Sequence, residues 1–266
     1  MTADFGQFER VGWAGRGPGY TGGFGALTAR CVPALLDAVD PCHGRLLIDV
    51  GTGTGIVAMA ASARGASVIG VDESASMLRT AAGYLPRLLR GRVQRLPVRD
   101  ASVDIVVGNC VVNHLPDPVA GLAELRRVLR PAGRLALTAW DMTGANEAIS
   151  VVARAVRAAG VDAPDLPANP FAAHGDPAAF AALLGTAGLH DVTVAPVHVV
   201  HVVEPGAWWE ALRSGTVMTS GQLAALDPAS RQRVRAAYDD LVAAYVDADG
   251  LAHLPAAAWL AAGRGG

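Results

Sequence analysis

Three glycines at alternate positions are the residues of this sequence best suited to hold a ligand. Gly51, Gly53 and Gly55 follow an apolar run that closes with Asp49 and a valine. Glycine lets backbone amides approach a ligand closely and permits a tight turn, and a helix N-terminus beyond the turn favours negatively charged groups. Asp72 ends the next apolar run, 19 residues after Gly53, where a carboxylate can accept hydrogen bonds from both hydroxyls of a ribose. The alternative interpretation of Asp72 is a cap for the helix that follows it.

The spacing of these glycines separates two kinds of ligand. The dinucleotide-binding fingerprint is G-x-G-x-x-G, but here the third glycine comes one residue early, and Ile56 stands where that fingerprint needs glycine. The G-x-G-x-G spacing, with a carboxylate two residues before it, resembles instead the first motif of the class I methyltransferases. This resemblance implies S-adenosylmethionine as the cofactor rather than a dinucleotide. The turn residues that we expect to bind it are Asp49, Gly51, Thr52, Gly53 and Gly55.

A second resemblance lies in residues 92–118, RVQRLPVRDASVDIVVGNCVVNHLPDP. This stretch resembles the segment of the ubiquinone-biosynthesis-type small-molecule methyltransferases that has a Leu-Pro pair, a strand, and then His-Leu-x-Asp. The similarity covers residues 45–140 well and the C-terminal part more loosely. It implies that Met77 packs on the adenine ring, although a plain core methionine is the alternative, and that Val93 and Asn109 contribute to the cofactor site. The family places an acidic residue where this chain has Arg92, a position that we still expect in the cofactor site, and arginine has no acceptor lone pair for the adenine amino group. Either the backbone amide and carbonyl groups of Val93 alone hold the adenine, or the cofactor binds differently.

Candidate catalytic side chains follow the strand expected at 103–109. His114 is the best candidate for a general base, a role worth roughly 10²–10⁴-fold in rate, and the alternative is a structural histidine bonded to a loop carbonyl. Asn113 and Asp141 are expected at the same end of the sheet, on the acceptor side, because ligands of open α/β sheets bind outside the carboxyl ends of the strands.

The elements that must position these residues alternate along the chain. Apolar runs alternate with helical patterns, which predicts βαβ units and a sheet covered by helices on both faces. We expect strands at 46–50, 67–72, 103–109, 134–140 and 191–203, and a closing edge strand within 255–264. We expect helices at 28–39, 56–65, 74–85, 117–133, 145–160, 176–188, 204–215 and 227–246, with Ser74 as an N-cap and with Pro131 and Gly133 ending their helix. The expected fold class is α/β: a doubly wound, mostly parallel, seven-stranded sheet of the Rossmann-like methyltransferase type with helical lid elements.

Two segments are expected to cover the ligands within a single domain over residues 1–266. The first is an N-terminal arm (residues 1–40), irregular over its first thirty residues, whose Trp13 and Tyr20 would face the acceptor. The second is residues 204–227, where adjacent helical residues point about 100° apart, so that Trp208 or Trp209 would line the acceptor pocket. The alternatives are a frayed leader for the arm and plain packing for both tryptophans.

Composition excludes several other classes of protein. The formal net charge is −2 and 52% of the residues are hydrophobic, which supports a buried core and gives no electrostatic signal for nucleic acid or an anionic membrane. Asn109 is not followed by the Pro-Pro-aromatic motif of nucleobase methylation. The N-terminal residues do not read as a signal peptide, and the three cysteines have no disulfide or metal-site spacing. We therefore expect a cytoplasmic protein without nucleic-acid, membrane or metal partners, and a homodimer stays open.

Two histidines need a separate interpretation. His198 and His201 are three residues apart on one expected strand and so lie on opposite faces, which argues against a shared metal site and for ordinary sheet residues. Three functions then remain: methyl transfer to a small organic acceptor such as a natural-product intermediate, a cyclisation or pericyclic reaction linked to the same cofactor, and cofactor binding without catalysis. The Arg92 departure keeps the second alternative open.

Overall fold

The structure is a computed structural model that describes residues 4–142 and 146–266. Its strands are β1 (Leu46–Val50), β2 (Ser67–Asp72), β3 (Leu88–Arg90), β4 (Val103–Asn109), β5 (Leu129–Trp140), β6 (Leu189–Val203) and β7 (Ala252–Gly265). Its α-helices are α1 (Phe5–Trp13), α2 (Gly17–Tyr20), α3 (Phe24–Thr28), α4 (Val32–Asp37), α5 (Ile56–Ala63), α6 (Ala75–Ala81), α7 (Pro118–Val128), α8 (Glu147–Ala158), α9 (Pro177–Thr186), α10 (Pro205–Gly215), α11 (Val217–Ala224) and α12 (Pro228–Ala243).

The strands form one seven-stranded sheet in the order β3-β2-β1-β4-β5-β7-β6. The pairs from β3 to β5 are parallel, and β7 runs antiparallel to both of its neighbours. Consecutive residues of β1 serve opposite faces, since Leu47 packs with α4 and α5 while Ile48 packs in the cluster that contains residues of α7 and α9. The doubly wound, mostly parallel sheet predicted from the sequence is therefore confirmed.

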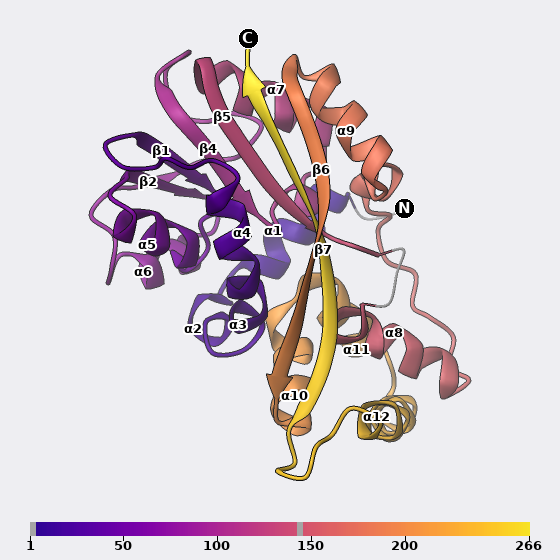
Figure 1. The fold of residues 1–266 in the computed structure, drawn as a ribbon. Helices are drawn as coiled ribbons and strands as arrows, with labels where there is room; N and C mark the ends of the chain where they lie inside the picture. The colour runs from indigo at the N-terminus through magenta and orange to yellow at the C-terminus, as the bar shows by residue number, and fades with distance from the viewer. Residues whose placement is uncertain (1–3, 143–145) are drawn as a thin grey trace.

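The long antiparallel pair β6–β7 extends well beyond the rest of the sheet (Figure 1). One half of this pair completes the sheet, and the other half carries a second layer of helices that includes α8, α10 and α12. Large side chains fill the space beneath these helices, among them Trp208, Tyr238 and Leu254, all of them fully buried. This second core is separate from the two clusters that pack on the faces of the main sheet.

Several boundaries differ from the sequence prediction. The helix expected at 117–133 ends at Val128, and Pro131 and Gly133 lie inside β5, which already begins at Leu129. The apolar stretch 255–264 belongs to β7, which lies between β5 and β6 and is not an edge strand. The expected helix at 28–39 is divided by a 3-10 turn, and the irregular start of the arm contains helix α1. Strand β3 and helix α11 were not predicted.

His201 of β6 lies against the second core. His201 is buried against Trp208, with ring centroids 4.4 Å apart, and neither of its ring nitrogens has a partner among the described residues. Residues 4–142 and 146–266 contain no group of three His, Cys, Asp or Glu side chains arranged to hold a metal ion. In the same ranges no helix is long and apolar enough to cross a membrane.

Candidate active site

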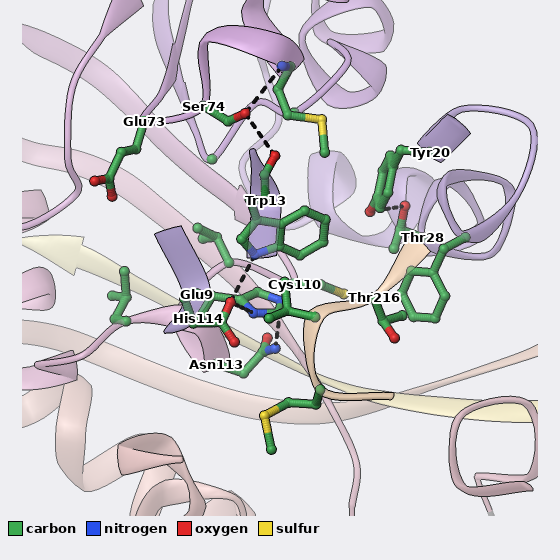
Figure 2. A pocket seen from close by; sticks show the side chains of 18 of the residues that line it. Glu9, Trp13, Tyr20, Thr28, Glu73, Ser74, Cys110, Asn113, His114 and Thr216 are labelled. Atoms are coloured by element: carbon green, nitrogen blue, oxygen red, sulfur yellow. Dashed lines mark hydrogen bonds and ion pairs between the residues drawn. The ribbon is translucent and has the colours of Figure 1, made fainter. Parts of the chain in front are cut away.

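A cavity of about 1540 Å³ opens at the carboxyl ends of β1, β2 and β4. The glycine-rich turn and the first residues of α6 line one part of it. Helices α1 and α11, together with the 3-10 turn Val112–His114, line another part. Figure 2 shows how side chains from these distant segments converge. The site therefore combines a part built by the sheet with a part built by helices far away in the sequence.

The glycine-rich turn needs glycine at each of its three positions. Gly51, Gly53 and Gly55 have φ values of +64°, +55° and +91°, in the left-handed region that side chains disfavour. A Cβ atom on Gly51 would also lie 2.3 Å from a methyl group of Val111. Gly51, Thr52 and Gly53 all line the cavity, so the backbone of the turn is presented to this space.

Asp49 supports this turn from below. Its side chain is fully buried and accepts a hydrogen bond of 2.6 Å from the Thr52 hydroxyl. Burial raises the pKa of Asp49 to about 7. Because Asp49 is not among the described residues that line the cavity, the expected direct contact with the cofactor is wrong for this structure. Its carboxyl acts on the ligand site through Thr52.

Asp72 stands at the rim of the turn, as predicted. Its carboxylate accepts hydrogen bonds from the backbone amides of Gly53, at 2.9 Å, and Ser74, at 2.8 Å. Burial raises the pKa of Asp72, although these amides oppose the shift. Ser74 caps α6 by accepting from the Met77 amide, and Met77 lines the cavity one turn into that helix. The carboxylate is thus fixed against the turn and remains part of the cavity wall.

Arg92 occupies the position where an acidic residue was expected. Its Nε donates to Glu73 Oε1 at 2.9 Å, and Arg10 of α1 lies 3.9 Å from the same oxygen. Val93 lines the cavity beside it. The Arg92 guanidinium is therefore paired with Glu73, and the Glu73 carboxylate lies in the cavity wall beside the position where the family has an acidic residue.

The polar network around His114 includes one residue that the sequence analysis missed. His114 Nδ1 lies 2.9 Å from Glu9 Oε2, and its Nε2 lies 3.0 Å from Asn113 Nδ2. The indole Nε1 of Trp13 donates to the same Glu9 oxygen at 2.8 Å, and the Trp13 ring meets the imidazole edge-on (Figure 2). Glu9 and Trp13 are four residues apart on α1 and so share one helix face. The four-residue spacing of Glu9 and Trp13 is visible in the sequence, but it indicates a shared face only if residues 5–13 form a helix, which was not predicted.

Tyr20 and Asn109 both line the cavity, and both contact Thr28 of the arm. The Tyr20 hydroxyl lies 3.3 Å from the Thr28 hydroxyl, and Asn109 Nδ2 donates to the Thr28 carbonyl at 2.9 Å. The other amide atom of Asn109 accepts from Thr138 at 2.6 Å. The side chain of Asn109 therefore fastens α3 to β4 and β5.

The predicted roles of Trp208 and Trp209 need correction. Trp208 stacks on Phe24 at 5.7 Å and donates its indole N–H to the Ala148 carbonyl, while Trp209 packs on Tyr238. Both tryptophans are buried in the helical layer, because that layer needs large side chains to fill it, and neither is among the described residues of the cavity wall. The same wall lacks Asp141. The residues of 204–227 that do line the cavity are Leu212, Thr216, Val217, Met218, Thr219 and Gln222.

Comparison with known proteins agrees with this geometry. Residues 48–137 match the family described as a methyltransferase domain. An uncharacterized methyltransferase of Mycobacterium tuberculosis is 36% identical over 111 residues, which are 41% of this chain and 45% of the relative. The demethylmenaquinone methyltransferase of Corynebacterium kroppenstedtii is 33% identical over 115 residues, 43% of this chain and 49% of that enzyme. The chain thus spans less than half the length of these relatives.

A solved structure extends the similarity to the whole fold. It is a proposed methyltransferase from an antibiotic biosynthesis pathway of Anabaena variabilis, with a TM-score of 0.60, 18% identity, and coverage of 87% of this chain and 96% of that one. The matched segment, the glycine-rich turn and the sheet order agree with the fold of the class I S-adenosylmethionine-dependent methyltransferases, which residues 45–140 resemble.

Proposed function

We propose that this protein transfers a methyl group from S-adenosylmethionine to a small organic acceptor, a natural-product intermediate, in the cytoplasm. The observation that carries the proposal is the single cavity that joins the glycine-rich turn and Asp72 to His114. Its volume of about 1540 Å³ exceeds the roughly 300–1,000 Å³ of a pocket for one drug-sized ligand. Such a volume supports binding of a cofactor and an acceptor side by side.

The residues of the turn and of α6 fit the cofactor by their chemistry. S-adenosylmethionine supplies an electrophilic methyl group on its sulfonium. The backbone of Gly51 and Gly53 binds its amino-acid part, and Asp72 accepts hydrogen bonds from the ribose hydroxyls. Met77 and Val93 pack on the adenine. We assign Glu73, held by Arg92, to the neighbourhood of the adenine amino group, where it supplies the acceptor oxygens that Arg92 lacks.

The remaining wall suits an apolar acceptor. It combines the large apolar side chains of Phe24, Trp140 and Phe171 with polar groups that can orient a ligand, among them Asn113, Ser150 and Thr216. We assign His114 as the general base, with Asn113 beside it, and Trp13 and Tyr20 as acceptor-side residues of the arm. Methyl transfer needs alignment above all, and positioning two reactants contributes up to roughly 7–11 kcal/mol to lowering a barrier. The buried walls on both sides of the cavity supply that alignment.

Calorimetry with S-adenosylhomocysteine and NAD tests the proposal directly. We expect S-adenosylhomocysteine to bind and NAD not to bind, because Ile56 replaces the third glycine of the dinucleotide fingerprint. Release of S-adenosylhomocysteine from methyl-labelled cofactor in the presence of an acceptor panel then tests turnover. Tight binding of NAD with none of S-adenosylhomocysteine would overturn the cofactor assignment.

A further inference from the structure

Helix α1 delivers a buried carboxylate to the imidazole of His114. Glu9 is 5% exposed, and its Oε2 receives both the Trp13 indole N–H and His114 Nδ1, at 2.8 and 2.9 Å. Ser74 donates to the Trp13 carbonyl at 3.1 Å and so anchors the end of the same helix to the cofactor side (Figure 2). The Glu9 carboxylate is thus held by its own hydrogen bonds, and the C-terminal end of its helix is held by Ser74.

The hydrogen bonds of this network fix one tautomer of His114. An indole N–H can only donate, so Glu9 Oε2 is an acceptor, and Nδ1 of His114 must carry the proton that it shares with this oxygen. Nε2 then has a free lone pair, which accepts the Asn113 amide N–H at 3.0 Å. Asn113 is itself held through its carbonyl, which accepts from Asn169 Nδ2 at 3.0 Å. The three hydrogen bonds therefore run in one direction: Asn169 donates to Asn113, Asn113 donates to His114, and His114 donates to Glu9.

Two acceptor atoms of the network have no donor. Glu9 Oε1 and Asn113 Oδ1 are buried, and among residues 4–142 and 146–266 neither finds a hydrogen-bond partner. A buried carboxylate or amide oxygen without a donor is costly. Since both residues line the cavity, a ligand with hydrogen-bond donors would satisfy these oxygens.

The charges in the cavity indicate which end an anion would avoid. Arg10, Arg90 and Arg92 line the cavity, and all three contact Glu73, two through its carboxylate and Arg90 through its backbone carbonyl. The charge that contacts His114 is instead the carboxylate of Glu9. Arg16 is attracted to Glu9, but it donates to Gly12, Ser214 and Ser220 and is not among the described residues of the cavity wall. An anionic acceptor would meet repulsion there, whereas a neutral hydroxyl would meet unpaired acceptors.

We propose that Glu9 is the positioning residue of a carboxylate–imidazole pair, and that the acceptor is a neutral molecule with an acidic hydroxyl, a phenol or an enol. This proposal rests on the proposed methyl transfer. The acceptor O–H replaces the Asn113 amide at Nε2, its proton passes to Nε2, and its oxygen forms the new bond to the methyl carbon as the carbon–sulfur bond breaks. The products are the methyl ether, neutral S-adenosylhomocysteine and an imidazolium ion. Glu9 stabilises that imidazolium and holds the ring in the reactive tautomer.

Nitrogen-15 NMR of the histidine rings tests the pair without needing turnover. In the full chain saturated with S-adenosylhomocysteine, His114 should have its proton on Nδ1, with its signals assigned from the His114→Gln variant. Glu9→Leu should move the proton to Nε2. Glu9→Gln, which keeps an acceptor oxygen, should leave it on Nδ1, and so should Asp165→Asn, a change at another carboxylate of the cavity wall that does not hydrogen-bond to His114. Circular dichroism and S-adenosylhomocysteine calorimetry establish that each variant is folded and binds the cofactor product.

Addition of a probe tests the class of acceptor in the same samples. We expect 2-naphthol to perturb the Nε2 signal of His114 and naphthalene-2-sulfonate, an anion of the same skeleton, to leave it unchanged. A wild-type His114 protonated on Nε2, a Glu9→Leu spectrum like that of wild type, or a response to the sulfonate and not to the naphthol would each overturn the proposal. If the wild-type protein does not bind S-adenosylhomocysteine, but His114 has its proton on Nδ1, the proposed function alone is overturned.

Discussion

Asp49, fully buried beneath the glycine-rich turn, makes the stability of the fold depend on pH in a direction that can be stated in advance. Desolvation raises the pKa of its carboxyl from 3.8 to about 7, and only one of its oxygens, the acceptor for Thr52, has a side-chain donor. The folded state therefore holds this proton more tightly than the unfolded chain does. The resulting stabilisation is fully present below about pH 3.8 and is lost as the pH rises through about 7.

The size of the effect follows from the two pKa values. A difference between 3.8 and about 7 corresponds to at most about 4 kcal/mol, at about 1.4 kcal/mol per pH unit. About 2–3 kcal/mol of this loss falls between pH 5 and pH 8. Asp49→Asn cannot ionise and keeps an oxygen for the Thr52 hydroxyl. The free energy of unfolding of this variant should therefore gain about 2–3 kcal/mol on that of the wild type between pH 5 and pH 8.

Urea unfolding at pH 5, 6, 7 and 8, followed by circular dichroism, measures this difference. The wild-type curve alone is not diagnostic, because burial lowers the pKa of His201 to about 4, so that His201 removes stability as the pH falls from 6.5 through about 4. Asp104→Asn is the matched control: despite its partial burial, the Leu46 amide and Arg130 lower the pKa of Asp104, so this variant should lose a constant amount of stability from pH 5 to pH 8. A constant difference for Asp49→Asn over the same range would refute the reasoning.

Three further substitutions test the site and its supports. Asp72→Asn should weaken binding of S-adenosylhomocysteine by about 1–3 kcal/mol, roughly 5–150-fold in Kd, because charged acceptors form the stronger hydrogen bonds. If calorimetry gives Asp72→Asn the same affinity as the Asp104→Asn control, the ribose role of Asp72 is excluded. Gly12→Ala places a methyl group 2.3 Å from Val217 on α11 and should speed amide hydrogen exchange in α1, whereas Gly19→Ala, whose Cβ meets no atom within 4 Å, should not; equal exchange in both would contradict the close packing of α1. Trp208→Leu should lower the free energy of unfolding by about 2–4 kcal/mol and leave cofactor affinity within twofold, and an unchanged urea midpoint would argue against its core position.

The part of the fold that the sequence predicted well depends on local patterns. The strands at 46–50, 67–72 and 103–109 have the predicted bounds, because each is a short apolar run with a polar residue in its last two positions and a turn after it. Strand β7 was assigned to the wrong place in the sheet. A strand that inserts between two others is defined by its partners, and its sequence alone does not specify them. The sequence predicts Pro131 and Gly133 as helix terminators, but they lie in a strand whose register shifts locally.

The candidate site divides in the same way. Gly51, Gly53 and Asp72 could be predicted because the chemistry that they serve constrains their spacing within one turn and two strands. Glu9 could not be predicted, since its role depends on α1 lying over His114, 105 residues away in the sequence. The two tryptophans of α10 were misplaced for the opposite reason: their size suits a pocket and a core equally well, and only the packing of α10 beside α3 and α8 decides between them.

The boundary of the family match falls between these two halves of the site. Residues 48–137 contain the glycine-rich turn, Asp72 and His114, all of which the sheet positions at its carboxyl edge. Glu9, Trp13 and Val217, which close the cavity on the acceptor side, lie outside that segment. Under the proposed function, the matched segment would hold the cofactor and the base, while α1 and α11 would select the acceptor. Trp13 contacts both halves, because it accepts from Ser74 through its backbone and donates to Glu9 through its ring. Displacing α1 should thus disturb both ends of the cavity together, although only one end is shared with the relatives.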